Sequence, residues 1–317
     1  MKAIICTKYG PPEVLQLQEV DKPFPKKDEV LIKIKATAVT ASDCVLRGLK
    51  MPGDPHFPKK QIMKLMVRLF MGFKKPRNPI IGSVFSGEIE SIGDRIQQFK
   101  KGDEVYGFSP TTLGGYAEYK GMTKKEFQRG GLSIKPSNTS HEEAAALVYG
   151  GVLALFFLRK MNVQNQAKIL IYGASGAIGS IAVQLAKNIG AEVTAVCSSS
   201  NTELVKSLGA DKTIDYTKEH SMNELESYDF VFDAVGKNKK SKLKSQSKKA
   251  LKENGRYVSV DDGLHKLGSL DLTNLKNLIE AGKIKAVIDK HYPIEQIVEA
   301  HKYVEKGHKK GNVVITI

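Results

Sequence analysis

Three glycines, each three residues after the last, follow a short apolar stretch near the middle of the chain. Residues 168–172 are β-prone, and an amphipathic run after the glycines predicts a helix. In such a turn the first glycine allows the bend, the second lets the backbone approach a phosphate, and the third lets helix and strand pack closely. Free N–H groups at the helix start hold an anion. The segment predicts the pyrophosphate site of a dinucleotide cofactor, made by Gly173, Ala174, Ser175, Gly176, Ala177, Ile178 and Gly179.

The turn after the next predicted strand indicates which nicotinamide cofactor binds. In such a site an acidic residue about 20 residues after the first glycine holds the ribose 2′-hydroxyl, and its absence leaves room for a 2′-phosphate. Here the turn carries Ser198, Ser199, Ser200 and Asn201, whose hydroxyl and amide groups donate hydrogen bonds to phosphate. NADPH is therefore preferred over NADH, although no Arg or Lys stands at the turn. The alternative is that the serines only cap the following helix.

Two parts of the chain with different sequence patterns supply the strands and helices that position these residues. Residues 1–135 contain short β-prone runs separated by Pro and Gly, whereas after residue 140 a long helix and then alternating strands and helices are predicted. Such alternation is typical of an α/β fold with a doubly wound parallel sheet, which has helices on both faces. With 317 residues the chain exceeds what a single core usually holds, so two domains are expected. The final β-prone run, 311–317, is expected to return to the first domain.

Composition narrows the class of protein. The hydrophobic fraction is 41% and the charged fraction 26%, as in ordinary globular proteins. Cys6, Cys44 and Cys197 form neither a disulfide framework nor a Cys-x-x-Cys metal half-site, which favours a reducing compartment. No apolar stretch reaches the roughly 18 residues of a membrane span, and the N-terminus resembles a strand rather than a signal peptide. A cytoplasmic location without a membrane partner is expected.

The net charge of +15 raises the question of a polyanionic partner. The lysines are spread over the chain, and the densest tract, 237–252, is expected to be the solvated outer face of a crossover helix. Nucleic acid is therefore not the expected partner. A second basic segment, 59–73, has apolar residues at helical spacing. It is expected to pack as an additional helix, the alternatives being a lid over the active site and a helix on a membrane surface.

The sequence lacks the motifs of two other enzyme classes. A hydrolase nucleophile elbow needs Gly-x-Ser-x-Gly, but Ser175 is followed directly by Gly176. Short-chain dehydrogenases place a Tyr-x-x-x-Lys pair after the glycine loop, whereas Tyr116 and Lys120, which have that spacing, precede it. Neither class fits the order of residues.

Short motifs occur in order along nearly the whole chain, at 9–15, 38–43, 82–89, 102–107, 115–119, 173–179, 208–211, 214–216, 233–236 and 255–258. Together they resemble the medium-chain dehydrogenase/reductase superfamily, in its zinc-independent NADPH:quinone oxidoreductase (zeta-crystallin-like) branch. The resemblance implies a GroES-like, β-rich catalytic domain at 1–125, completed by 286–317. It implies a Rossmann cofactor-binding domain at 126–285, with the active site in the cleft.

The resemblance also implies catalysis without a metal. Zinc-dependent relatives hold the metal with Cys, His and a further Cys or Asp, and the corresponding positions here are Thr40, Ser83 and Tyr149, which implies no zinc. Hydride then passes from the nicotinamide directly to a small-molecule quinone or to the β-carbon of an enone. The catalytic candidates are Thr40, Asp43 and Tyr149, with Ser42 beside them. Asp43 has the alternative role of capping the helix that follows.

Family position implies further cofactor contacts at Tyr216, Val235, Val260 and Asn312. Tyr216 would pack on the adenosine end, unless it is only a strand-end tyrosine. Leu153 stands where relatives carry a nicotinamide-contacting Thr, so one contact is expected to be lost. Between Val260 and Leu275 the chain is too short for the helix and edge strand with which relatives pair two subunits. A homodimer is therefore expected to be weaker than in relatives, or absent.

The chain is thus expected to be an NADPH-dependent, zinc-independent oxidoreductase that reduces a quinone or an α,β-unsaturated carbonyl compound. An alternative is an NADPH-binding regulatory or RNA-binding protein with vestigial catalysis, to which the net charge, Leu153 and the lysine tract point. A zinc-dependent alcohol dehydrogenase is the third and weakest hypothesis.

Overall fold

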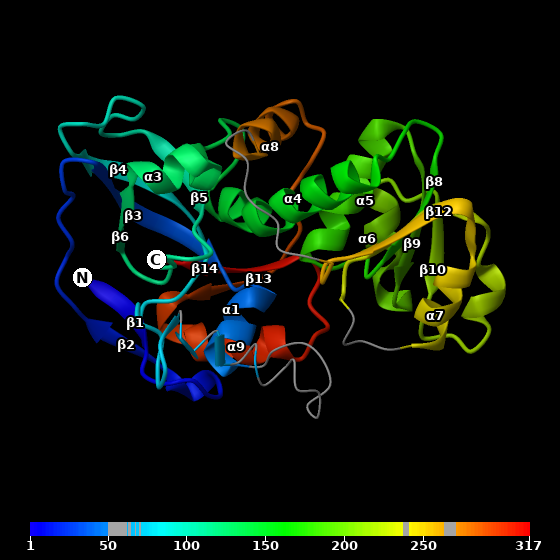
Figure 1. Ribbon diagram of the computed structural model, residues 1–317, viewed down its shortest axis with the longest axis horizontal. Helices are drawn as coiled ribbons and strands as arrows, with labels where there is room; N and C mark the ends of the chain where they lie inside the picture. Colours follow the sequence, from blue (N-terminus) through cyan, green and yellow to red (C-terminus); the bar gives the residue numbers. More distant parts are fainter. Residues whose placement is uncertain (50–61, 63–64, 67, 70, 237–240, 263–270) are drawn as a thin grey trace. The chain divides into compact units, whose positions relative to one another are not determined.

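The computed structural model describes residues 1–49, 62, 65–66, 68–69, 71–236, 241–262 and 271–317. The chain divides into two compact units, described separately below (Figure 1). The first unit contains Met1–Tyr149, Leu267–Glu280 and Ile288–Ile317, and the second contains Gly150–Lys266 and Ala281–Val287. The first unit continues beyond the expected boundary after residue 125 because β7 pairs with β5 and the Glu280 carboxylate accepts hydrogen bonds from Ser137.

The first unit is built on a seven-stranded sheet. Its strand order is β13-β14-β3-β4-β5-β7, with β6 paired to β3, and all pairs are antiparallel except β13 with β14. The bounds are β3 (Glu29–Ala38), β4 (Val84–Ile92), β5 (Glu104–Phe108), β6 (Tyr119–Thr123), β7 (Leu132–Ile134), β13 (Ile288–Pro293) and β14 (Asn312–Thr316). The pairing of β14 with β3 confirms that the last strand returns to the first domain.

Apolar side chains at alternate positions explain why this sheet forms. Val30, Ile32 and Ile34 of β3 are almost fully buried and pack with Phe85 and Ile89 of β4. A separate hairpin joins β1 (Lys2–Cys6) to β2 (Leu15–Glu19). Among the described residues, the helices that lie wholly in this unit are α1 (Ala41–Gly48), α3 (Lys124–Glu126), α8 (Asp271–Glu280) and α9 (Ile297–Glu305).

The second unit contains a five-stranded parallel sheet in the order β10-β9-β8-β11-β12. The strands are β8 (Lys168–Tyr172), β9 (Glu192–Cys197), β10 (Lys212–Asp215), β11 (Tyr228–Asp233) and β12 (Leu251–Ser259). The run Ile169–Ile171 has no exposed surface, as in strands buried on both faces. Helices α5 (Ala177–Ile189) and α6 (Thr202–Ser207) pack on β8, β9 and β10, and α7 (Lys242–Lys249) packs on β12. This confirms the predicted doubly wound α/β fold.

Helix α4 (His141–Met161) begins as predicted from its sequence. The N–H of Glu143 donates to the Ser140 hydroxyl, and the Glu143 carboxylate accepts from the N–H of Ser140, which makes a capping box. By length and composition α4 is long and apolar enough to cross a membrane. Most of its residues are buried within the fold, as in the core helix of a globular protein.

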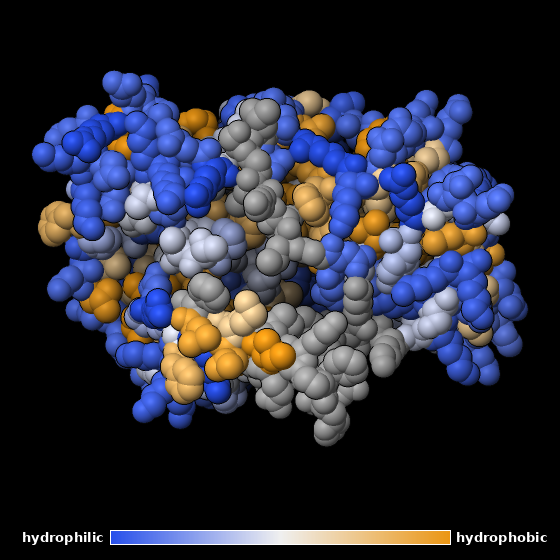
Figure 2. All heavy atoms as spheres, viewed as in Figure 1, coloured by the Kyte–Doolittle hydropathy of each residue, from blue (hydrophilic) through white to orange (hydrophobic). Residues whose placement is uncertain are grey.

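Two basic segments fall partly outside the described residues. In segment 59–73, Ile62, Leu65, Met66 and Leu69 expose half or more of their surface, which differs from the packed helix expected there. Of the lysine tract, residues 237–240 are not described, and α7 exposes most of its lysines as predicted while burying Lys244. Hydrophilic residues cover most of the visible surface in Figure 2.

All three cysteines are buried and unpaired. Burial raises the pKa of the Cys6 thiol to about 11 and that of Cys44 to about 12, and it also raises the pKa of Cys197. The Cys44 sulfur lies 3.4 Å from Nδ1 of His301, inside the first unit. The structure therefore agrees with the absence of a disulfide framework.

Candidate functional site

The glycine loop has the geometry that its three glycines predict. Gly173 follows β8 with φ +80°, and a Cβ there would overlap the Val235 side chain. At Gly179, in the first turn of α5, a Cβ would overlap the Gly173 carbonyl oxygen and lie 2.8 Å from the Ala174 Cα. At Gly176 the nearest described atom to such a Cβ is the Gly173 oxygen, 3.4 Å away. The backbone at Gly176 is therefore open to a ligand, while Gly173 and Gly179 are tightly packed.

The start of α5 suits an anion. Its N-cap is Gly176, and no described side chain caps it or places a carboxylate in its first turn. The first N–H groups of a helix and its dipole favour negative charge when no side chain satisfies them. The residues present therefore fit the pyrophosphate of a dinucleotide.

The turn after β9 is tied to the glycine loop by Asn201. Its Nδ2 donates to Ser175 Oγ and to Ser198 Oγ, each at 3.1 Å. The start of α6 has no side-chain cap among the described groups, so the alternative that the serines only cap this helix is not supported. Ser199 and Ser200 are exposed. Both side chains are thus accessible to a ligand beside the loop, while the Ser200 hydroxyl also lies 3.2 Å from Ser198 Oγ and the Ser199 hydroxyl contacts Asp215.

Sequence reasoning missed a carboxylate next to this turn. Asp215 ends β10, where its register partner on β9 is Cys197, and is 8% exposed. Burial raises its pKa, but hydrogen bonds from Thr217 and from Ser199 outweigh burial, and the pKa lies below its usual value. The parallel register of β9 and β10 is the signal that could have placed Asp215 there.

Two buried oxygens in this region lack donors. Among the described groups, neither Asp215 Oδ2 nor Asn201 Oδ1 has a hydrogen-bond partner, although both residues are more than nine-tenths buried. Buried acceptors are normally satisfied. A ligand that brings hydroxyl or amino donors, as the adenosine part of a dinucleotide does, fits them.

The remaining cofactor candidates of the second unit lie at the same edge of the sheet. Tyr216 directly follows β10 and is 44% exposed, while Val235 and Val260 follow β11 and β12. The carboxyl ends of parallel strands meet at one edge, where dinucleotides bind. Leu153 is buried in α4, and Asn312 begins β14 in the first unit.

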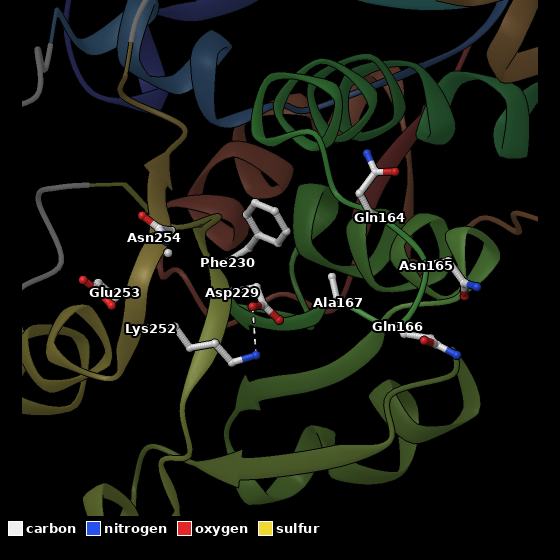
Figure 3. Close-up of a pocket in the computed structure, with 10 residues that line it drawn as sticks. Gln164, Asn165, Gln166, Ala167, Asp229, Phe230, Lys252, Glu253 and Asn254 are labelled. Carbon is white, nitrogen blue, oxygen red and sulfur yellow. Dashed lines mark hydrogen bonds and ion pairs between the residues drawn. The ribbon is translucent and has the colours of Figure 1, made fainter.

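A polar pocket lies at the opposite, amino-terminal edge of this sheet (Figure 3). Its volume is about 490 Å³, and Asp229 and Lys252 form an ion pair of 2.8 Å in its wall. None of the predicted site residues lines it. The glycine loop, not this pocket, is the candidate cofactor site.

Hydroxyl groups cluster at the start of α1 in the first unit. Ser42 Oγ lies 2.9 Å from the Tyr149 hydroxyl, and the Tyr149 ring packs edge-on against Phe108 with centroids 6.2 Å apart. Thr40 Oγ1 lies 3.4 Å from Ser83 Oγ, and both residues are buried. The positions that correspond to a metal site in relatives thus carry hydroxyls, with Thr40 beside Ser83 and Tyr149 beside Ser42.

Asp43 is a capping residue of α1. Its carboxylate accepts hydrogen bonds from the N–H of Thr40 (2.9 Å) and the Thr40 hydroxyl (2.7 Å), while the N–H of Asp43 donates to Thr40 Oγ1. The helix begins at Ala41, earlier than the start at Cys44 that sequence suggested. Burial raises the pKa of Asp43, which is 1% exposed. The alternative role of Asp43 as a helix cap is therefore what the geometry shows.

A series of buried hydrogen bonds leads from Arg47 to the Asp43 carboxylate. Arg47 Nε donates to His301 Nδ1 (3.3 Å), so His301 Nε2 carries the proton and donates to the Tyr116 hydroxyl (3.2 Å). Tyr116 in turn donates to the Asp43 carboxylate (3.2 Å). Burial and the Arg47 charge lower the pKa of His301 to about 3. These residues are far apart in sequence, so no local pattern could predict this series of hydrogen bonds.

The donor set does not fit zinc. Thr40, Ser83 and Tyr149 offer hydroxyls, whereas protein zinc sites use Cys, His, Asp or Glu. Within the described ranges, no three His, Cys, Asp or Glu residues gather as a metal site would require.

Comparison with known proteins matches both units. The alcohol dehydrogenase GroES-like domain model matches residues 26–133, and zinc-binding dehydrogenase models match 177–284 and 264–315. A 2-methylene-furan-3-one reductase of Solanum lycopersicum is 33% identical over 99% of this chain and 79% of its own length. The chain belongs to the medium-chain dehydrogenase/reductase superfamily. A chloroplast envelope quinone oxidoreductase homolog of Arabidopsis thaliana is 30% identical over 99% of this chain and 98% of its length.

A solved structure extends this likeness to the fold. The quinone oxidoreductase of Coxiella burnetii has a TM-score of 0.83 with 28% identity, over 100% of this chain and 99% of that one. The β-rich first unit is accordingly GroES-like and the second a Rossmann unit. Membership of this superfamily identifies the chain as an oxidoreductase that uses a nicotinamide cofactor.

Proposed function

We propose that the chain is a zinc-independent reductase that transfers hydride from NADPH to a quinone or an α,β-unsaturated carbonyl compound. The observation that carries the proposal is a dinucleotide-type glycine loop in a chain whose metal-site positions hold hydroxyls instead of zinc ligands. The names of relatives support the substrate class, since they include an NADPH-dependent alkenal/one oxidoreductase and quinone oxidoreductases.

The loop from Gly173 to Gly179 and the Ser198–Asn201 turn would hold the cofactor, which supplies the hydride when bound. Ser42 and Tyr149 are proposed to donate hydrogen bonds to the acceptor oxygen as negative charge develops on it. Each such donor contributes about 3 kcal/mol in comparable enzymes. Tyr149 is the proposed proton donor to the enolate or quinol oxygen.

Thr40 and Asp43 are proposed to act through Ser42. The Thr40 hydroxyl proton is committed to the Asp43 carboxylate, and both side chains are buried. Their capping box fixes the first turn of α1, and this turn presents Ser42 to Tyr149. They are therefore positioning residues in this proposal rather than groups that touch the acceptor.

Replacing Tyr149 with phenylalanine is expected to lower kcat roughly 100-fold, because the proton donor is lost. Ser42→Ala, which removes the hydrogen-bond partner of Tyr149, is expected to have a smaller effect. Steady-state kinetics with a saturating enone should show the fall in kcat with the KM for NADPH unchanged. Tyr303→Phe removes a hydroxyl that bonds Asp289 elsewhere in the unit and serves as control. Full activity of Y149F would contradict the assignment.

A panel of quinones, enals and enones, each with NADPH and with NADH, tests the whole proposal. NADPH is proposed as the preferred cofactor. Asp215 is expected to reduce the preference for NADPH over NADH, because its buried carboxylate also suits the 2′-hydroxyl of NADH. The ratio of the kcat/KM values for the two cofactors is therefore the decisive measurement. If no acceptor oxidises either cofactor, the enzyme proposal fails.

Removing metals is expected to leave the activity unchanged. After incubation with a strong chelator and gel filtration, the protein should reduce its best acceptor at the same rate, and elemental analysis should find no stoichiometric zinc. One bound zinc per chain, lost together with the activity, would favour a zinc-dependent dehydrogenase instead.

The net charge keeps a second candidate function open, an NADPH-binding regulatory or RNA-binding protein. Steeply salt-dependent RNA retention that competes with NADPH would support it, and no retention at physiological salt would remove it. The weak or absent homodimer and the cytoplasmic location remain part of the proposal. Light scattering tests the former, and localisation of the tagged full chain tests the latter, since several relatives are named chloroplastic or mitochondrial.

A further inference from the structure

Lys244 differs from the other lysines of α7. Lys242, Lys248 and Lys249 are exposed, whereas Lys244 is only 7% exposed. Its ammonium lies 2.5 Å from Asp233 Oδ2 and donates to the Gly236 carbonyl oxygen, also at 2.5 Å. Burying a charge costs several kcal/mol unless it is paired and hydrogen-bonded. These two contacts satisfy that requirement and connect α7 to the end of β11.

The Asp233 carboxylate accepts hydrogen bonds from the turn after β11 and from β12. It has no exposed surface, and its Oδ1 accepts the N–H groups of Val235 (3.2 Å) and Gly236 (3.1 Å). Its Oδ2 accepts the hydroxyls of Tyr257 (2.8 Å) and Ser259 (3.2 Å) from β12. The turn after β11 is thus held by Asp233 at its N–H groups and by Lys244 at the Gly236 carbonyl.

This turn lies directly against the glycine loop. A Cβ on Gly173 would overlap Val235 Cγ1, so the Val235 side chain lies against the Cα of Gly173. The N–H of Ala234 also donates to the Tyr172 carbonyl oxygen at 3.0 Å, one residue before the loop. Any shift of the turn is therefore transmitted to the glycine that begins the loop, because close-packed interiors transmit strain.

We propose that Lys244 is a positioning residue of the cofactor site. It fixes the turn Val235–Gly236 at two points, through Asp233 and through the Gly236 carbonyl, and so holds Val235 against Gly173. An apolar side chain could fill the same space but could make neither contact. The proposal rests on the proposed cofactor site at Gly173–Gly179.

The test is the affinity for NADPH in the full chain, measured by fluorescence titration alongside kinetics. Lys244→Met should raise the NADPH dissociation constant roughly tenfold or more, while kcat at saturating NADPH stays within about threefold. Lys249→Met, at an exposed lysine near the end of the same helix, should match the wild type.

A double variant covers the case in which K244M does not fold. Asp233→Asn combined with Lys244→Met leaves no unpaired buried charge, yet still lacks the contact to the Gly236 carbonyl. It should fold and bind NADPH as weakly as expected for K244M. A folded K244M or double variant with wild-type affinity would overturn the proposal. Failure of the wild-type chain itself to bind NADPH would contradict the proposed function instead, and that is measured first.

Discussion

Replacing Gly179 with alanine is expected to weaken NADPH binding by roughly one to two orders of magnitude. The added Cβ would overlap the Gly173 carbonyl oxygen and press on Ala174, so α5 must move away from β8. Overpacking of this kind costs about 1–3 kcal/mol, and each 1.4 kcal/mol is about tenfold in affinity. The N-terminus of α5 would then be displaced from the place where it is proposed to bind the phosphates. Fluorescence titration with NADPH measures the loss.

Gly121→Ala is the matched control for this substitution. A Cβ at Gly121 meets no described atom within 4 Å, and the residue lies in the strand β6 of the first unit. The same change of Gly to Ala should there leave NADPH affinity unaltered. Wild-type affinity in G179A with an intact thermal transition would show that the loop does not hold the cofactor.

Acidification is expected to destabilise the protein through His301. Its pKa is about 3 in the folded chain against 6.5 for the free side chain, so between these values the unfolded state binds a proton that the folded state excludes. The free energy of unfolding should therefore fall as the pH is lowered through this window, by up to about 1.4 kcal/mol per pH unit from this group alone. Above about pH 6.5 the contribution is constant. Urea unfolding at several pH values measures it.

His301→Gln isolates this contribution. The variant is less stable at neutral pH because the Arg47 and Tyr116 contacts are perturbed, but its stability should fall less steeply between pH 6.5 and 3. Carboxylates without contact to this hydrogen-bond network contribute equally to both proteins and cancel in the comparison. His291→Gln changes an exposed histidine and should keep the slope of the wild type. Equal slopes for H301Q and wild type would refute the role of His301.

The features that sequence predicts well are those with a local physical cause. The bend at Gly173 and the close packing at Gly179 follow from the absence of a side chain, and both are present. The predicted start of a long helix after residue 140 likewise has a local cause, the hydrogen bonds between Ser140 and Glu143 at the start of α4. The alternation of strands and helices then predicts the parallel sheet, because only that arrangement buries both faces.

The features that sequence missed depend on contacts between distant residues. Asp215 lies beside the serine turn only because β10 pairs with β9 in parallel register. In the sequence Lys244 does not differ from the solvated lysines around it, and only the fold brings Asp233 to its ammonium group. The hydrogen bonds that run from Arg47 through His301 to Asp43 likewise join α1 to α9, and no spacing in the sequence predicts that contact.

The burial of all three cysteines has a chemical consequence for a protein proposed to handle enals and quinones. Such acceptors are soft electrophiles, and they alkylate thiolates much faster than thiols. Because burial keeps the pKa of Cys6 near 11 and that of Cys44 near 12, and also raises that of Cys197, these sulfurs are protonated and shielded at neutral pH. The fold thus exposes no thiolate to the proposed substrates. We therefore expect the protein to reduce enals and quinones without its cysteines being alkylated by them.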